Sequence, residues 1–283
     1  MRYGNCVPFK NANHIKILKA AGFDYIETNL SAFLDASESE ITDFLSSLKE
    51  NNITCEAVNV LFPGGIILTG EQADYPKVAD YINIIFEKTK NIGFKTVVFG
   101  SGGARKCPDG FPKEKAIEQI IEVAGRFLLP AAEKYDFTLA IEELHRGETN
   151  IINTIDEAEY IAEQINNPRI KVLADLYHIG LENDDATKLS QKGGMLAHCH
   201  IANPYNGRKY PQASDSSEAI ELYKKFFSSL KSAGYIKTLS IEGGLGGLLD
   251  CDFDKTEIPE WVEKDDRLFY AESKKSLEFM ISL

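Results

Sequence analysis

The sequence predicts a single (β/α)8 barrel that takes up the whole chain, residues 1–283. Short runs rich in β-branched and aromatic residues alternate with longer amphipathic stretches, as expected for parallel strands joined by helices. No stretch rich in Pro, Gly or Ser divides the chain, and barrels of this kind typically fill about 250 residues as one domain. A doubly wound sheet is the second choice, but the Gly-x-Gly-x-x-Gly motif that usually follows its first strand is absent.

The sequence also gives approximate bounds for the elements. The eight expected strands are Tyr3–Val7, Tyr25–Thr28, Thr54–Val60, Thr96–Gly100, Thr138–Glu142, Lys171–Asp175, Leu196–Ala202 and Thr238–Glu242. Helices are clearest at Glu38–Asn51, Tyr75–Ile92, Lys113–Tyr135, Ile155–Ile165, Ser216–Ser232 and about Asp265–Leu283. Glycines follow three helical stretches, at Gly22, Gly93 and Gly234, where left-handed caps are expected. The polar segment Pro204–Ser214 is expected to lie over the barrel mouth.

Composition excludes several classes of partner. Lys and Arg total 31 against 43 Asp and Glu, a net charge of −12 that disfavours nucleic acid. The first residues lack the apolar segment of a signal peptide, and no uninterrupted apolar run is long enough to span a membrane. Five scattered cysteines without a C-x-x-C pair indicate neither a disulfide framework nor a zinc ribbon. We therefore expect a cytoplasmic protein with a small-molecule partner, and a homo-oligomer is left open.

Four residues with metal-binding side chains stand at the ends of the last four expected strands. They are Glu142, Asp175, His200 and Glu242. Active sites of (β/α)8 barrels lie at the carboxyl ends of the strands, so these side chains are expected to converge there. Three carboxylates with one imidazole suit one divalent metal ion, Mn²⁺ by preference, with Mg²⁺, Co²⁺ or Zn²⁺ also compatible.

Neighbouring polar residues receive other interpretations. Glu143 faces away from Glu142 because adjacent strand residues alternate, and a structural role is expected for it. His198 shares a face with His200 but lies deeper, so we expect it to support the ligand. Glu27, at the end of the second strand, is expected to have a structural polar role. The segment Gly100–Lys106 could form a backbone nest for an anion or an ordinary barrel loop.

Four segments of the chain resemble a known family. Residues 141–150 (Ile-Glu-Glu-Leu-His-Arg-Gly-Glu-Thr-Asn) resemble its Glu-x-Leu-Asn-Arg-x-Glu segment, and Asp175-Leu176-Tyr177-His178 resembles its Asp-x-x-His. Residues 198–202 (His-Cys-His-Ile-Ala) resemble its His-x-His strand, and residues 240–243 (Ser-Ile-Glu-Gly) its final Glu strand. The chain is thus similar to the xylose-isomerase-like TIM barrel family, which includes sugar-phosphate isomerases/epimerases and ketose 3-epimerases.

The resemblance implies roles for individual residues. Glu142, Asp175, His200 and Glu242 would bind one divalent metal, and Glu142 and Glu242 would also be the catalytic acid and base. Glu148, His178 and Arg208 would bind the substrate's hydroxyl groups. Two departures from the family pattern concern sugar recognition. Residues 203–207 lack the usual Glu, and His145 stands where Asn is common.

The resulting hypothesis is a divalent-metal-dependent epimerase or isomerase of a sugar or sugar phosphate. Carboxylates would move a proton beside a carbonyl through an enediolate that the cation stabilises. The alternative is a lyase or dehydratase of a polyol or keto-sugar, in which a group leaves instead of a proton returning. Abasic-site endonucleases share the barrel, but their zinc site needs more histidines than the five present here, and the acidic charge of this chain disfavours DNA binding.

Overall fold

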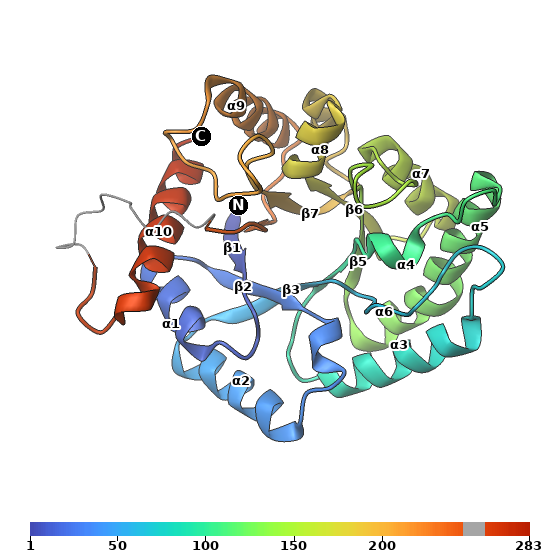
Figure 1. Cartoon of the computed structure of the whole chain (residues 1–283), viewed down its shortest axis with the longest axis horizontal. Coiled ribbons are helices and arrows are strands. Elements are labelled where there is room, and N and C mark those ends of the chain that lie inside the picture. The colour runs from blue at the N-terminus through green and yellow to red at the C-terminus, as the bar shows by residue number, and fades with distance from the viewer. Residues whose placement is uncertain (246–257) are drawn as a thin grey trace.

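The strands form one closed, parallel barrel. The computed structural model describes residues 1–245 and 258–283, so Cys251 lies outside the described part. Each strand pairs with its successor, and β8 pairs with β1 (Figure 1), which confirms the predicted (β/α)8 barrel. The strands are β1 Arg2–Cys6, β2 Tyr25–Asn29, β3 Thr54–Asn59, β4 Thr96–Phe99, β5 Thr138–Glu142, β6 Ile170–Asp175, β7 Leu196–Ile201 and β8 Thr238–Ile241.

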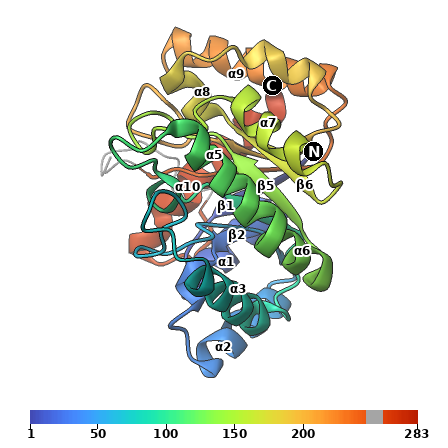
Figure 2. The same cartoon turned by 90° about the vertical axis from the view of Figure 1, so that its right-hand side faces the viewer.

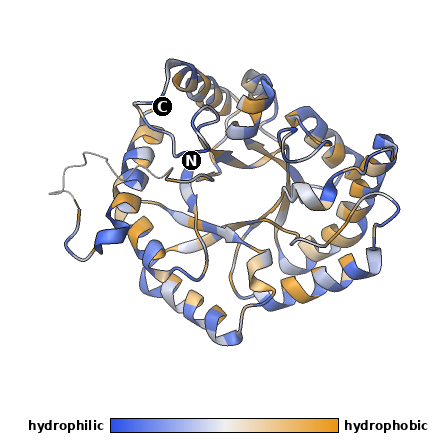
Figure 3. Cartoon of the chain, viewed as in Figure 1, coloured by the Kyte–Doolittle hydropathy of each residue, from blue (hydrophilic) through white to orange (hydrophobic). Residues whose placement is uncertain are grey.

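Helices surround the strands on all sides of the barrel in Figure 1, and Figure 2 shows α5 and α6 outside the strands from the side. Their striped colouring in Figure 3 reflects apolar faces that pack on the barrel. None of the helices in the described part has the length and hydropathy needed to cross a bilayer. The helices are α1 Ala12–Ala21, α2 Glu38–Glu50, α3 Tyr75–Thr89, α4 Gly102–Arg105, α5 Lys113–Glu122, α6 Leu129–Tyr135, α7 Ile155–Ile165, α8 Leu176–Glu182, α9 Ser217–Ser232 and α10 Arg267–Ser282.

One predicted helix has the expected bounds but an irregular middle. The expected helix Lys113–Tyr135 contains a π-helical turn at Val123–Leu128 that separates α5 from α6. Pro130 follows this turn and has no N–H to donate to the carbonyl four residues earlier, so the regular α-helical pattern is interrupted there. Gly22 and Gly234 have positive φ just after the ends of α1 and α9, which confirms two of the predicted glycine caps. Gly93 also has positive φ but does not cap α3, which ends earlier, at Thr89, with Lys90 as its cap.

The interior of the barrel has two chemically different halves. Beneath Glu142 and Asp175 lies an apolar half formed by Val98, Ala140 and Leu173, which cluster apart from the main core between strands and helices. Beneath His200 lies a polar half formed by Tyr25, Glu27, His198 and Ser240, all fully buried. Gly4 makes room for this half, since a Cβ there would collide with the Tyr25 ring.

Candidate active site

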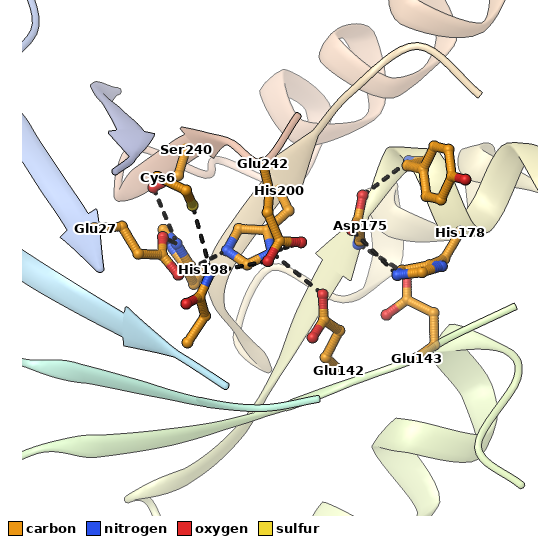
Figure 4. Close-up of polar contacts among 12 residues, drawn as sticks. Cys6, Glu27, Glu142, Glu143, Asp175, His178, His198, His200, Ser240 and Glu242 are labelled. Carbon is orange, nitrogen blue, oxygen red and sulfur yellow. Dashed lines mark hydrogen bonds and ion pairs between the residues drawn. The ribbon is translucent and has the colours of Figure 1, made fainter. Parts of the chain in front are cut away.

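The four predicted metal ligands meet at the carboxyl ends of β5 to β8. One ligand atom from each of Glu142, Asp175, His200 and Glu242 can be chosen so that all four lie within 4.8 Å of one another. His200 Nδ1 is 3.2 Å from Glu142 Oε1 and 3.3 Å from Glu242 Oε2. Figure 4 shows these side chains pointing toward a common centre. The strand-end pattern therefore corresponds to a real cluster in space.

Burial makes this cluster electrostatically costly. Glu142, Asp175 and His200 are buried, and burial raises the pKa of Glu142. Burial, together with the like charges of Glu142 and Glu242, raises the pKa of Asp175 to about 7. Burial would also raise the pKa of Glu242, but His200 and Arg208 outweigh it and lower that pKa. Several carboxylates this close need a cation among them if all are to be ionised.

The donor atoms that remain available fit a divalent cation. Asp175 Oδ1 accepts a hydrogen bond of 2.8 Å from the backbone N–H of Tyr177, at the start of α8. Asp175 Oδ2 is buried and has no hydrogen-bond partner among the described residues. This oxygen lies 3.7 Å from the Arg208 guanidinium and 3.5 Å from His178 Nε2, and it is available to bind a cation. With two glutamates and one imidazole nitrogen, this set matches the chemistry of Mn²⁺, Mg²⁺, Co²⁺ and Zn²⁺ sites.

Arg208 reaches the cluster from the segment Pro204–Ser214. Its guanidinium contacts Glu242 Oε2 and lies 3.7 Å from Asp175 Oδ2 and 3.2 Å from Glu148 Oε1. It also lies 4.6 Å from the centroid of the Tyr177 ring, where the aromatic face attracts a cation. The backbone of Arg208 is left-handed, with φ of 59°. This turn directs the side chain back over the barrel mouth.

His178 presents a single N–H toward the same centre. Its Nδ1 accepts the backbone N–H of His145 at 3.1 Å, so the neutral ring carries its proton on Nε2. Nε2 is 3.5 Å from Asp175 Oδ2. Burial, reinforced by the charge of Arg208, lowers the pKa of His178 to about 2 and keeps the ring neutral. His178 and Arg208 thus offer donors, and the half-exposed Glu148 offers an acceptor, for hydroxyl groups at the mouth.

The sequence interpretation overlooked Asn59. Its Nδ2 donates a hydrogen bond of 2.8 Å to Glu242 Oε1. Asn59 and Glu242 both line a cavity of about 400 Å³ at the carboxyl ends of β1 to β3, together with Cys6 and Asn29. Asn29 and Asn59 each end a strand, which is the same positional signal that predicted the four candidate ligands at the carboxyl ends of β5 to β8. A larger groove, of about 660 Å³, lies beside α10 and is lined by none of the predicted site residues.

The segment Gly100–Lys106 does not present its arginine to an anion. Arg105 is fully buried and donates to the backbone carbonyls of Phe99 at 2.8 Å and of Glu142 at 2.6 Å. Gly100 lies so close to Glu142 that a Cβ there would collide with Oε2. The segment therefore ties the end of β4 to the end of β5 and leaves space for the Glu142 carboxylate. These contacts of Gly100 and Arg105 are structural, as expected for an ordinary barrel loop.

The remaining polar neighbours lie where strand alternation placed them. Glu143 points out of the barrel, and its Oε1 accepts the backbone N–H of Asp175 at 2.8 Å. His198 lies below His200, and Glu27 lies between the two histidines (Figure 4).

Comparison with known proteins places the chain in a family. Residues 15–257 match the family model described as xylose isomerase-like TIM barrel. The chain belongs to this family. An L-ribulose 3-epimerase of Methylomonas sp. (strain DH-1) is 23% identical over 274 residues, which cover 92% of this chain and 87% of the relative. The curated relatives are sugar epimerases, which confirms the predicted enzyme class, an isomerase or epimerase.

Solved structures of the family have the same fold. The D-psicose 3-epimerase of Clostridium cellulolyticum H10, solved with D-tagatose, has a TM-score of 0.79 at 16% identity, covering 100% of this chain and 99% of that one. The IOLI protein, solved with a bound zinc atom, has a TM-score of 0.71 at 18% identity, covering 100% of this chain and 98% of that one. At these identities the likeness concerns the fold.

Proposed function

We propose that this protein is a divalent-metal-dependent epimerase or isomerase of a sugar or sugar phosphate. The observation that carries the proposal is the convergence of Glu142, Asp175, His200 and Glu242, with Asp175 Oδ2 left without a hydrogen-bond partner among the described residues. These four residues would hold the cation, with Mn²⁺ preferred. When bound, a divalent cation stabilises, as a Lewis acid, the negative charge that develops on a carbonyl oxygen during proton removal.

Glu142 and Glu242 are the proposed acid and base. They approach the centre from β5 and β8, and each has an oxygen within 3.3 Å of His200 Nδ1 between them. One carboxylate removes a proton beside the carbonyl, and the other returns a proton from its own side. Return to the opposite face of the same carbon gives epimerisation, and return to the neighbouring carbon gives isomerisation.

Glu148, His178 and Arg208 are the proposed substrate-binding residues. The N–H groups of His178 and Arg208 can donate to sugar oxygens, while Glu148 can accept from a hydroxyl group. The cavity beside Glu242 provides space for the rest of the sugar. The 3-epimerase relatives act on ketoses according to their names, which supports a ketose as the first substrate to test.

The test is a substrate screen on metal-free and reloaded protein. Free ketoses and their phosphates are incubated in D₂O after removal of metal with EDTA and after addition of Mn²⁺ or Co²⁺. We expect loss of turnover on chelation, recovery with either metal, and deuterium at the reacting carbon. Full turnover without metal would overturn the metal requirement, and an isomeric product with no deuterium from any substrate would overturn proton transfer through solvent-exchanging carboxylates. A product of lower mass than the substrate would identify a lyase.

A further inference from the structure

A buried carboxylate lies directly behind the proposed ligand His200. Glu27 belongs to β2, and its side chain crosses the barrel interior toward β7 (Figure 4). Glu27 Oε1 is 3.0 Å from His200 Nε2, and Glu27 Oε2 is 2.8 Å from His198 Nε2. All three side chains are 0% exposed. Burying an ionised carboxylate without partners costs free energy, so the two histidine contacts are what stabilises Glu27 in this position.

Hydrogen-bond chemistry determines where the protons lie in this trio. An ionised carboxylate only accepts, so each histidine presents Nε2–H to Glu27. A neutral imidazole has a single N–H, so Nδ1 of a neutral His200 carries a lone pair. His198 Nδ1 lies 2.8 Å from the Thr238 hydroxyl, which can donate to it, and 3.0 Å from the Thr238 carbonyl oxygen, to which it donates when protonated. His200 Nδ1 instead faces the oxygens of Glu142 and Glu242.

The orientation of His200 has a direct consequence for the metal site. A nitrogen lone pair and two carboxylates repel one another unless a positive charge lies among them. Because the Nε2–H of His200 donates to Glu27, only Nδ1 of His200 is free to bind a metal ion held by Glu142 and Glu242. Hydrogen bonding of this kind fixes the tautomer and ring orientation of a metal-binding histidine and raises the basicity of the nitrogen that binds.

We propose that Glu27 is a positioning residue of the metal site: by accepting Nε2–H from both His198 and His200, it fixes Nδ1 of His200 as the metal-binding atom. This inference rests on the proposed function, because it assumes that the cluster binds a cation. Glu27 itself is not a ligand. Cys6, Glu27 and His200 also lie close enough to be grouped as a metal site, but both oxygens of Glu27 are occupied by the histidines.

The first experiment measures metal affinity. Titration calorimetry with Mn²⁺ compares metal-free wild type, Glu27→Gln and Tyr25→Phe. A glutamine accepts one N–H but turns its NH₂ toward the other imidazole, so we expect Mn²⁺ affinity to fall about 10- to 100-fold. Tyr25 is the matched control, since it is buried two residues away on the same strand and its hydroxyl contacts Ser240 at 2.8 Å. We expect Tyr25→Phe to stay within about threefold of wild type, as it leaves the Glu27 contacts intact.

The outcomes separate the two proposals. A folded Glu27→Gln variant within about threefold of wild type would overturn the positioning role. Equal weakening by both substitutions would also overturn it, because the effect would then come from general packing. Binding of two Mn²⁺ ions per chain, with the second lost in Glu27→Gln, would make Glu27 a ligand. If the wild type binds no divalent metal, the proposed function itself fails.

A second measurement uses wild-type protein alone and stays decisive even if Glu27→Gln does not fold. Nitrogen-15 NMR of the zinc-loaded protein reports which nitrogen of each histidine carries a proton. We expect His200 to show a protonated Nε2 and a metal-bound Nδ1, and His198 a protonated Nε2. A protonated Nδ1 or a metal-bound Nε2 on His200 would overturn the inference.

Discussion

The two halves of the barrel interior support the candidate site in different ways. Glu142 and Asp175 lie above apolar side chains such as Ala140 and Leu173, two residues earlier on the same strands. His200 lies above a polar half in which Glu27 and His198 form a hydrogen bond with each other. The apolar half offers the two carboxylates little solvation, and their pKa values rise through burial. The polar half instead holds its histidine in one orientation.

This contrast suggests a division of roles. Poorly solvated carboxylates favour binding of a cation, because the cation restores the stabilisation that burial removed. An oriented imidazole favours one geometry for that cation. Glu242 lies at the boundary between the halves, where Asn59 and Arg208 both contact its carboxylate. The largest functional effects are therefore expected at the carboxylates, and smaller ones at the residues that hold them.

The largest effect is expected from removing a carboxylate that moves a proton. Glu142→Gln and Glu242→Gln should each lower kcat about 10²- to 10⁴-fold, the usual contribution of a general acid or base. Steady-state kinetics and deuterium exchange at the reacting carbon check this with Mn²⁺ at saturation. Glu148→Gln is the comparison, and we expect it to raise KM more than it lowers kcat. Loss of less than about tenfold in kcat in either of the first two variants would contradict the assignment.

The next effect separates the two interior halves by stability. Leu173→Ala should lower the free energy of unfolding by about 2–5 kcal/mol, because it leaves a cavity in the apolar half. Tyr25→Phe removes one hydrogen bond in the polar half and should cost about 0.5–1.5 kcal/mol. Urea unfolding of both metal-free variants provides the measurement. Similar losses in the two would show that the polar half is held by packing as much as by hydrogen bonds.

The fold and the convergence of the proposed ligands were predictable because both follow from local patterns. The strand β5 and the helix α7 have the bounds that the sequence indicated. Glu142, Asp175 and His200 were found because a closed parallel barrel brings all strand ends to one rim, whatever the details of packing. No three-dimensional information was needed beyond that rule.

The contacts between side chains were not predictable, because they depend on register and loop geometry. A register shift in the pairing of β2 with β3 leaves Glu56 of β3 without a partner between Cys55 and Ala57, which the sequence does not reveal. The hydrogen bond from Asn59 to Glu242 joins residues 183 positions apart. Arg105 lies in a surface-loop pattern of the sequence, yet it is fully buried and the carbonyls of Phe99 and Glu142 accept hydrogen bonds from its guanidinium. Local composition does not encode such partners.

Asn59 should have an intermediate effect on catalysis. Its hydrogen bond to Glu242 Oε1 holds the carboxylate at the boundary between the halves. Hydrogen bonds to charged groups contribute about 1.5–3 kcal/mol, so Asn59→Ala should lower kcat/KM about tenfold or more. Kinetics with saturating Mn²⁺ would check this, and Asn59→Gln tests whether the donor must have this reach. An unchanged kcat/KM in Asn59→Ala would mean that Arg208 alone suffices to hold Glu242.

The smallest effect concerns Glu143, which is buried just outside the apolar half. Burial raises its pKa well above the ordinary range, and its Oε2 has no hydrogen-bond partner among the described residues. The folded state therefore binds the Glu143 proton more tightly than the unfolded chain does. It follows that the wild type loses stability as the pH rises above the ordinary carboxyl pKa of about 4.3.

The glutamine in Glu143→Gln cannot lose a proton, so this variant should not show the part of the stability loss that comes from residue 143. The measurement is the free energy of unfolding of metal-free protein in urea, taken for the variant minus the wild type. We expect this difference to grow by about 1 kcal/mol or more between pH 5 and pH 8. Glu133→Gln, at an exposed position of α6, is the control, and its difference should stay constant with pH. Glu142 and Asp175 titrate in both proteins, so their contributions largely cancel in the difference. A constant difference for Glu143→Gln would mean that burial beside the apolar half does not by itself penalise a carboxylate, and the contrast between the two halves would lose its electrostatic basis.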